Sequence, residues 1–371
     1  KYIEKSAQLA ADVDNYGTCN YRLTKNTPVA VVDDSNISIL QKLHPNEVYP
    51  PSVPRLRSSR RRKNTKQRHK NCKQFIISPD VIVNNILHLK KGKATGLQVD
   101  SIDLFIILAQ RCRHNNSKKK TLKSFSSTLA EFFTLVANGK IPKSLISIYR
   151  TTYLVALEKD PDDNTKLRPL GIPSAVRRIT ANTIANETKA QFADHLLPYN
   201  YAVGIKGGID FITSTVRLAV EKYITNQTEL GLLPTRALVS LDIRNMFNAI
   251  SRHKLREIVQ EEFPRLAAFV DCLYEEQGKS IVKMDDGEWE EIPVCEGFSQ
   301  GCPLSPILAA IVLNHILKHV DSVLKRRAST RSKSQSDDGM GGLAIIMAYV
   351  DDANFLVPLE DVKPLLEAFK E

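Results

Sequence analysis

Three aspartates at the ends of apolar segments are the first residues in this 371-residue chain that could do chemistry. Asp242 closes one apolar segment, and Asp351 and Asp352 follow a second. An isolated carboxylate in apolar surroundings is costly unless it is paired or binds metal. Magnesium takes oxygen ligands from one or two carboxylates, and two such ions about 4 Å apart serve in-line phosphoryl displacement. We therefore expect a site for two Mg²⁺ ions, with Mn²⁺ as a substitute.

An Asp-Asp pair alone is also typical of an ordinary hairpin turn. Whether Asp351 and Asp352 indicate a metal site therefore depends on the other motifs of the chain. The four relevant segments, in chain order, are KLRPLGIP (166–173), LDIRNMF (241–247), GFSQGCPLSP (297–306) and AYVDD (348–352). This series resembles the motifs of reverse transcriptases. It is most similar to those of non-LTR retrotransposons, with group II intron and retron enzymes as more distant relatives. The resemblance covers residues 153–356 and implies an α+β right-hand polymerase, with fingers and a ferredoxin-like palm built on an antiparallel sheet.

The resemblance implies roles for the residues around the aspartates. Asp242 and Asp351 would coordinate both metal ions with the main-chain carbonyl of Ile243, and Asp352 would lie beside them. Tyr349 would lie near the primer terminus. Two departures from the family pattern, Val350 in place of alanine and Asn248 in place of aspartate, remove no metal ligand.

The nucleotide site follows from the same resemblance. Phe247 would block a ribose 2′-hydroxyl, although a core aromatic at the start of a helix is the alternative. Gln300 and Gly301 would lie against the incoming nucleotide and template, with Gly301 allowing close backbone approach.

Cations for the triphosphate are expected on the fingers, because phosphoryl transfer depends mainly on positioning and charge stabilisation. Arg168 matches the arginine of the fingers. Lys159 is the better candidate for the fingers lysine, and Lys166 competes with it or is an ordinary turn lysine. Gly207 and Gly208 would allow close approach to the template backbone, or simply form a loop before a helix at 211–223.

The implied activity is that of an RNA-directed DNA polymerase, a nucleotidyltransferase whose partners are an RNA template, a DNA primer and dNTP. An inactive, nucleic-acid-binding remnant of a retroelement is one alternative. An RNA-directed RNA polymerase is another, and it is disfavoured by Phe247 and by the absence of glycine before the aspartate pair. The chain ends nineteen residues after Asp352, so we expect a fragment or truncated copy that stops before the thumb.

Hydrophobic periodicity and turn residues indicate the elements that must position these residues. We expect a helix starting at Ser78, a helix over 122–138, hairpins over 151–173 and 280–294, and a helix over 177–196. Ser305 is predicted to cap the helix that begins at Pro306, and the basic stretch 111–123 is predicted to be a loop. The expected domains are an N-terminal extension (1–74), a helical region (75–150), fingers (151–235) and a palm (236–371) with a fingers hairpin at about 280–295.

The net charge of +11 points to a polyanionic partner. Ten Lys and Arg and no acid lie between residues 48 and 79, so one segment carries the excess. We expect a flexible basic arm over 50–73, either binding nucleic acid or serving nuclear import, or else a solvated tail; its centre is Arg60, Arg61, Arg62 and Lys63. No run of 18 apolar residues, no signal-peptide pattern and no CxxC pair occurs, which favours an intracellular, nuclear or cytoplasmic protein away from membranes.

Overall fold

The computed structural model describes residues 29–45, 74–92, 96, 101–114, 120–160, 163, 165–231, 233–331 and 343–370, and the basic arm lies outside them. The strands are β1 (Thr152–Glu158), β2 (Leu167–Ile172), β3 (Arg236–Asp242), β4 (Gly278–Lys283), β5 (Trp289–Val294), β6 (Ile345–Tyr349) and β7 (Asp352–Pro358). The α-helices are α3 (Asp34–Leu43), α5 (Pro79–Leu87), α6 (Ile102–His114), α7 (Lys120–Ala137), α8 (Lys143–Arg150), α9 (Ala175–Leu196), α10 (Gly208–Val220), α11 (Asn226–Glu229), α12 (Met246–Ala249), α13 (Arg252–Glu262), α14 (Pro264–Tyr274), α15 (Ser305–Thr330) and α16 (Val362–Lys370). A π-helix spans Glu221–Thr225 and a 3₁₀-helix Leu359–Asp361.

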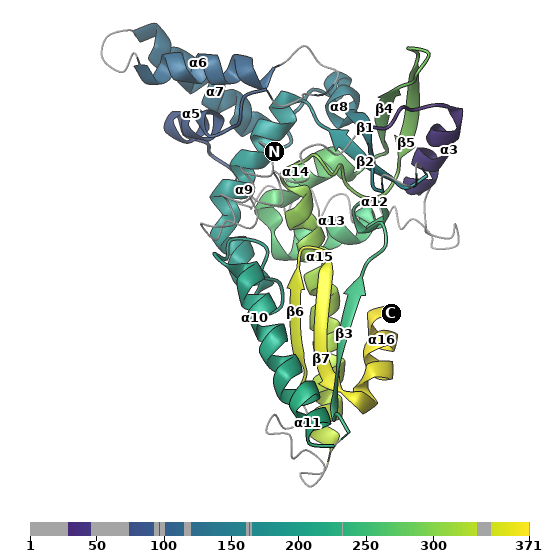
Figure 1. The fold of residues 1–371 in the computed structure, drawn as a ribbon. Coiled ribbons are helices and arrows are strands. Elements are labelled where there is room, and N and C mark those ends of the chain that lie inside the picture. The colour runs from purple at the N-terminus through teal and green to yellow at the C-terminus, as the bar shows by residue number, and fades with distance from the viewer. Residues whose placement is uncertain are drawn as a thin grey trace, which may run out of the picture.

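The lower half of the molecule is a sheet of order β3-β7-β6, with antiparallel neighbours (Figure 1). Side chains alternate along its strands, so that Val239 and Phe355 join the main core while Ser240 and Asn354 lie on the opposite face. At the far end of that opposite face, Tyr223 covers Leu356.

Helix α15 lies against the core face of this sheet and is the most apolar long helix in the described part of the chain (Figure 1). By length and composition alone it could span a membrane, but 61% of its 18-residue apolar window is buried inside the protein. Its buried positions include Ile311, Leu313 and Leu317. It is therefore packed as the central core helix.

The upper sheet has the order β2-β1-β4-β5 and is built from two hairpins. The expected hairpins are confirmed: β1 pairs antiparallel with β2, and β4 with β5. The turn of the second hairpin contains Gly287, whose φ of +91° suits glycine. Strands β1 and β4 pair in parallel at Thr152 and Tyr153 only, so the rest of that edge of β1 is open.

The segment before α3 occupies this open edge. The Ala30 amide donates to the Ala156 carbonyl over 3.0 Å, and the Asp285 amide donates to the Val32 carbonyl over 3.0 Å. Ala30, Val32 and Leu40 are buried against Leu154, Val282 and their neighbours in a separate small core. The N-terminal extension thus joins β1 to the tip of the β4–β5 hairpin.

A helical region formed by α5, α6 and α7 packs against α9. As expected, Ser78 caps α5 and accepts from the Val81 amide, with Pro79 in the first turn. The expectation of a loop over 111–123 is wrong at both ends, because α6 continues to His114 and α7 begins at Lys120. Helical geometry at both ends of the stretch shows that a run of basic residues does not by itself end a helix.

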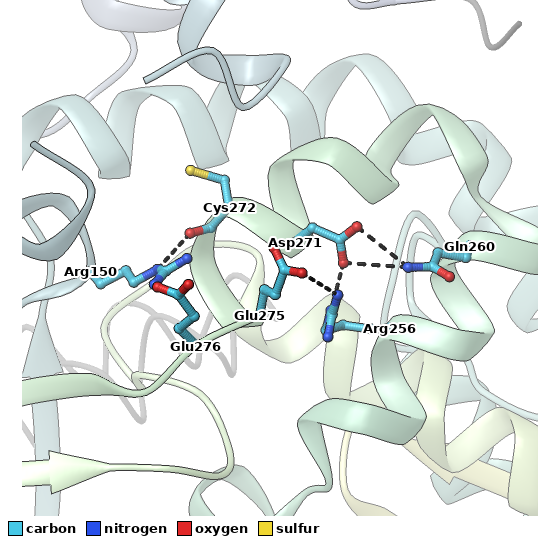
Figure 2. Close-up of polar contacts among 7 residues, drawn as sticks. All are labelled: Arg150, Arg256, Gln260, Asp271, Cys272, Glu275 and Glu276. Atoms are coloured by element: carbon cyan, nitrogen blue, oxygen red, sulfur yellow. Dashed lines mark hydrogen bonds and ion pairs between the residues drawn. The ribbon is translucent and has the colours of Figure 1, made fainter. Parts of the chain in front are cut away.

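Helix α14, which leads into β4, is held by two arginines (Figure 2). Arg150 donates to the Cys272 carbonyl over 2.8 Å and to Glu276 over 2.6 Å. Arg256 of α13 donates to Asp271 over 2.6 Å. Because α14 immediately precedes the β4–β5 hairpin, these contacts fix that hairpin to the helical body of the protein.

Candidate active site

The structure brings Asp242, Asp351 and Asp352 together at one end of the lower sheet. Asp242 is the last residue of β3 and lies directly opposite Asp352, the first residue of β7. Tyr349 also lies opposite Asp352 across the β6–β7 pair, so Val350 and Asp351 form a two-residue turn. Directly opposed residues share a face of the sheet, and Asp242 and Asp352 are both exposed there.

The charges of Asp351 and Asp242 act on the carboxyl group of Asp352. Burial raises the pKa of Asp352 above its ordinary value, and the negative charges of Asp351 and Asp242 raise it further. None of the three forms an ion pair with a described Lys, Arg or His. A cluster of like charges with no cation beside it fits a divalent metal in its donor chemistry.

The aspartates suit a metal site whose coordination shell is completed by water and substrate oxygens. No three His, Cys, Asp or Glu side chains of the described residues stand close enough together to form a finished metal site. Magnesium usually binds proteins through one or two carboxylates and keeps water and phosphate oxygens for the rest of its shell. Oxygen donors at Asp242, Asp351 and the Ile243 carbonyl are suited to that mode.

The turn that carries Asp351 has an unusual backbone. Val350 has φ +56°, a left-handed conformation that is costly for a β-branched residue. The segment 199–201 runs beside β6 at this point: the Ala348 amide donates to the Tyr199 carbonyl over 2.7 Å, and the Tyr201 amide donates to the Ala348 carbonyl over 3.0 Å. The sequence does not predict this extra pairing, because no hydrophobic periodicity marks so short a segment.

The loop after Asp242 is closed against the loop that contains Gln300. Phe247 is half-buried on the edge of the core, and its carbonyl accepts from the Phe298 amide over 2.6 Å. The Gly297 amide donates to the Ile250 carbonyl over 2.8 Å. A Cβ at Gly297 would overlap the backbone of Asn248, and its φ is +67°. The two loops therefore approach as closely as glycine permits.

Arg252 is a buried residue of this region that the sequence analysis missed. Its guanidinium donates to the Gly297 carbonyl over 2.9 Å and to the Val294 carbonyl over 2.7 Å, and its amide donates to Glu296 over 2.7 Å. Burial lowers the pKa of Arg252 to about 10, so it stays charged at neutral pH. One side chain thus fixes both ends of the turn that precedes Phe298.

Asn245 ties the loop after Asp242 to the N-terminal extension. Its φ is +55°, which asparagine tolerates better than most residues. Its side-chain amide donates to the Leu43 carbonyl at the end of α3 over 2.9 Å, and its oxygen accepts from Asn248 over 2.9 Å. The extension therefore reaches the loop that carries Phe247.

Gly301 joins the upper sheet to the active-site loops. Its amide donates to the Gly171 carbonyl of β2 over 3.1 Å, and an added Cβ would lie 2.5 Å from that oxygen. The Gly301 backbone therefore lies close to strand β2, and its expected approach to the nucleotide and template stays a prediction. Ser305 is the first residue of α15 and donates to the Ser299 carbonyl over 2.8 Å, so the expected Ser305 cap is wrong: the N-cap is Leu304.

The fingers candidates lie around the β1–β2 hairpin. Arg168 is exposed and lies opposite Leu157. Lys166 forms ion pairs with Asp160 at 2.9 Å and Asp163 at 3.3 Å. Hydrogen bonds to Asp160, then to Asp163, raise the pKa of Lys166. Lys159 is exposed and has no ion pair among the described residues, which favours it over Lys166 as a ligand for phosphate.

Gly207 and Gly208 lie at the start of α10, and their expected contact with the template backbone stays a prediction. Gly207 has φ +67° at the N-cap position. Gly208 is buried, and a Cβ there would overlap the Tyr201 carbonyl oxygen. The left-handed backbone at Gly207 and the close packing at Gly208 each favour glycine. The arm residues Arg60, Arg61, Arg62 and Lys63 lie outside the described residues.

The site is that of a nucleic-acid polymerase palm: an antiparallel sheet that ends in three aspartates, closed by glycine loops and joined to the β1–β2 hairpin. Residues 157–371 match the family described as "Reverse transcriptase (RNA-dependent DNA polymerase)". The chain belongs to this family, and the expected resemblance to reverse transcriptases is confirmed.

Two known proteins show the extent of the similarity. The "Retrovirus-related Pol polyprotein from type-1 retrotransposable element R2" of Popillia japonica is 27% identical over 239 residues, which cover 62% of this chain and 29% of that protein. The chain therefore spans less than a third of this curated relative. The structure of telomerase from Candida albicans, in complex with the TWJ fragment of telomeric RNA, has a TM-score of 0.40 and 11% identity over 67% of this chain and 44% of that one.

Proposed function

We propose that this chain is the fingers and palm of a reverse transcriptase of a non-LTR retroelement, which adds deoxynucleotides from dNTP to a primer on an RNA template. The observation that carries the proposal is the opposition of Asp242 and Asp352 beside Asp351, at the end of the sheet that faces the two closed loops. The similarity to the R2 polyprotein supports the lineage. The domain boundaries, the ferredoxin-like arrangement of the palm and an intracellular location, nuclear or cytoplasmic, are part of this proposal.

In the proposed reaction the primer 3′-oxygen bonds to the α-phosphorus of dNTP. The bond to the β,γ-diphosphate breaks, pyrophosphate leaves, and the 3′-hydroxyl proton is released. Asp242, Asp351 and the Ile243 carbonyl would hold up to two Mg²⁺ ions, with Asp352 beside them. When bound, such ions supply charge neutralisation of the phosphates and lower the pKa of the attacking hydroxyl.

The chain's own residues have separate tasks. Lys159 and Arg168 stabilise the charge of the triphosphate. Phe247 occupies the space of a ribose 2′-hydroxyl, and Gln300 contacts the nucleotide from the facing loop. Tyr349 lies at the primer end of the same sheet edge.

The direct test is primer extension on an RNA template with dNTP and Mg²⁺. Wild-type protein is expected to extend the primer, and Asp351→Asn to lose activity by at least about 100-fold, because a catalytic metal ligand is removed. Asp285→Asn, at the exposed tip of the β4–β5 hairpin, is the matched control and is expected to retain activity. Equal signals from wild type and Asp351→Asn contradict the proposal and favour a nucleic-acid-binding remnant.

A second assay separates DNA from RNA synthesis. Phe247→Ala is expected to increase ribonucleotide incorporation relative to deoxynucleotide incorporation. A preference for ribonucleotides in the wild type would favour the RNA polymerase alternative. Unchanged selectivity between ribonucleotides and deoxynucleotides in Phe247→Ala would show that Phe247 is a core aromatic residue and does not exclude the 2′-hydroxyl.

A further inference from the structure

Asn200 is a fully buried polar residue next to the catalytic turn, and its exposed fraction is 0%. It lies in the connection between α9 and α10, where its amide donates to the Leu196 carbonyl over 2.9 Å. Tyr199 and Tyr201 on either side of it both bind the backbone of Ala348. Asn200 thus forms an isolated parallel β-bridge with Ala348 near the end of β6.

Both ends of the Asn200 side chain have a partner. Its Nδ2 donates to the Val350 carbonyl over 3.2 Å, and its Oδ1 accepts from the Ala202 amide over 3.1 Å. A carbonyl can only accept and a backbone amide can only donate, so these partners fix which end of the amide faces Val350. The NH₂ group therefore binds the turn, and the oxygen binds its own segment.

Val350 needs such a partner. A β-branched residue at φ +56° carries strain of about 1–3 kcal/mol, and such strain persists only where the surroundings determine the conformation. Val350 is one of only two residues between the paired positions Tyr349 and Asp352, and the other is Asp351. A change in the Val350 peptide therefore changes the direction of the Asp351 carboxylate.

We propose that Asn200 is a positioning residue for the metal site, acting through the Val350 carbonyl to hold Asp351 in its binding orientation. This inference rests on the proposed function, in which Asp351 is a metal ligand. Residues behind metal ligands typically change metal affinity or activity by about 10–100-fold when they are removed. A residue that positions a metal ligand affects the Mg²⁺ requirement and kcat more than the KM for dNTP.

The test compares Asn200→Ala with Asn314→Ala. Asn314 of α15 is a matched control, because it is also 0% exposed and also donates to one main-chain carbonyl, that of His195, over 3.0 Å. Three quantities are measured: Mn²⁺ affinity by electron paramagnetic resonance, amide hydrogen exchange of the peptide 345–356, and the Mg²⁺ dependence of primer extension. The first two do not require catalysis.

Asn200→Ala is expected to weaken Mn²⁺ binding by about tenfold, to speed exchange in 345–356 and to lower kcat at fixed Mg²⁺. Asn314→Ala is expected to change none of these. Unchanged Mn²⁺ affinity in Asn200→Ala, or equal losses in both variants, would overturn the inference. Primer extension that fails in wild type overturns the proposed function instead, and the Mn²⁺ titration then still reports on Asn200.

A double variant tests the route through Val350. Glycine accepts positive φ without strain, so Val350→Gly is expected to recover most of the Mn²⁺ affinity lost in Asn200→Ala. Strictly additive effects of the two changes would show that Asn200 does not act through Val350. Where Asn200→Ala does not fold, Asn200→Asp at pH 8 keeps the side-chain volume and the bond from Ala202 but loses the donor to Val350, and it is expected to show the same loss.

Discussion

Asp242 and Asp352 are direct partners across the antiparallel pair β3–β7, although 109 residues of chain lie between them. The register that opposes them is set by their neighbours, because Leu241 lies opposite Ala353 and Val239 opposite Phe355 on the core face. A slip of one residue would turn these apolar side chains to the open face and the aspartates into the core. The hydrophobic core therefore fixes where the carboxylates meet.

Their proximity makes the metal-free protein sensitive to pH at Asp352. Burial, Asp351 and Asp242 raise its pKa. A carboxyl whose folded-state pKa lies above the unfolded value costs stability at higher pH, and the cost disappears as the pH falls below the unfolded value. In EDTA at pH 7, Asp352→Asn is therefore expected to melt at a higher temperature than wild type, by scanning calorimetry. The difference should shrink as the pH falls to 3.8, the ordinary value for Asp.

Two controls accompany this measurement. Asp285→Asn, at an exposed hairpin tip, should leave the melting temperature unchanged. Added Mg²⁺ should stabilise wild type more than Asp352→Asn, because the ion relieves the same repulsion. An Asp352→Asn variant that melts at or below the wild-type temperature at pH 7 would show that the three charges do not oppose folding.

The sequence predicts the elements of this fold where local signals are strong. Both hairpins and the capped start of α5 at Ser78 are confirmed. We expect Ser305 at a cap because serine before proline commonly begins a helix, but its hydroxyl instead donates to the carbonyl of Ser299, six residues earlier in the preceding loop. The cap rule fails here because a carbonyl of the preceding loop accepts the hydroxyl that would otherwise cap the helix.

The residues that hold the candidate site could not be predicted from the sequence. Asn200 donates to a carbonyl 150 residues away along the chain, and Arg252 donates to carbonyls 45 and 42 residues away. Neither residue lies in one of the four motifs. Which backbone carbonyl a buried amide or guanidinium meets depends on the assembled fold. The aspartates were predictable because their chemistry is visible in residue type and spacing, whereas a positioning contact has no such pattern.

The two fingers lysines are expected to differ in their effect on dNTP binding. Lys166 is already paired with Asp160 and Asp163, whereas Lys159 has no described ion pair. Lys159→Ala should raise the KM for dNTP about tenfold or more, because a charge-assisted hydrogen bond is worth about 1.5–3 kcal/mol. Lys166→Ala should change KM little. Steady-state kinetics decide this, and the reverse order of effects would assign the phosphate contact to Lys166.

Arg252 and Arg256 lie on the same helix, α13, and offer a matched pair of variants. Arg252→Met removes two hydrogen bonds to loop carbonyls and is expected to cost about 2–3 kcal/mol and to weaken discrimination against ribonucleotides. Arg256→Met removes the contact with Asp271 (Figure 2) and should lower stability without changing that discrimination. Urea denaturation and competition between dNTP and rNTP measure the two effects. Unchanged selectivity in Arg252→Met would separate the 294–301 loop from the nucleotide site.

Gly301 and Gly278 test whether β2 and the active-site loop need direct backbone contact. Neither has a positive φ, so alanine strains neither backbone. A Cβ at Gly301 would lie 2.5 Å from the Gly171 carbonyl oxygen, whereas at Gly278 the nearest atom is 3.6 Å away. Gly301→Ala is therefore expected to cost about 1–3 kcal/mol by overpacking and to reduce primer extension, while Gly278→Ala should leave both near wild type.

The combination of outcomes identifies the role of that contact. Because the displaced backbone belongs to β2, which carries Arg168, loss of activity in Gly301→Ala should appear mainly as a higher KM for dNTP. A stability loss without any change in KM would mean that the fingers strand moves without affecting the nucleotide. Normal stability in Gly301→Ala would show that β2 and the loop can separate, and that the 3.1 Å bond between Gly301 and Gly171 does not hold the upper sheet to the site.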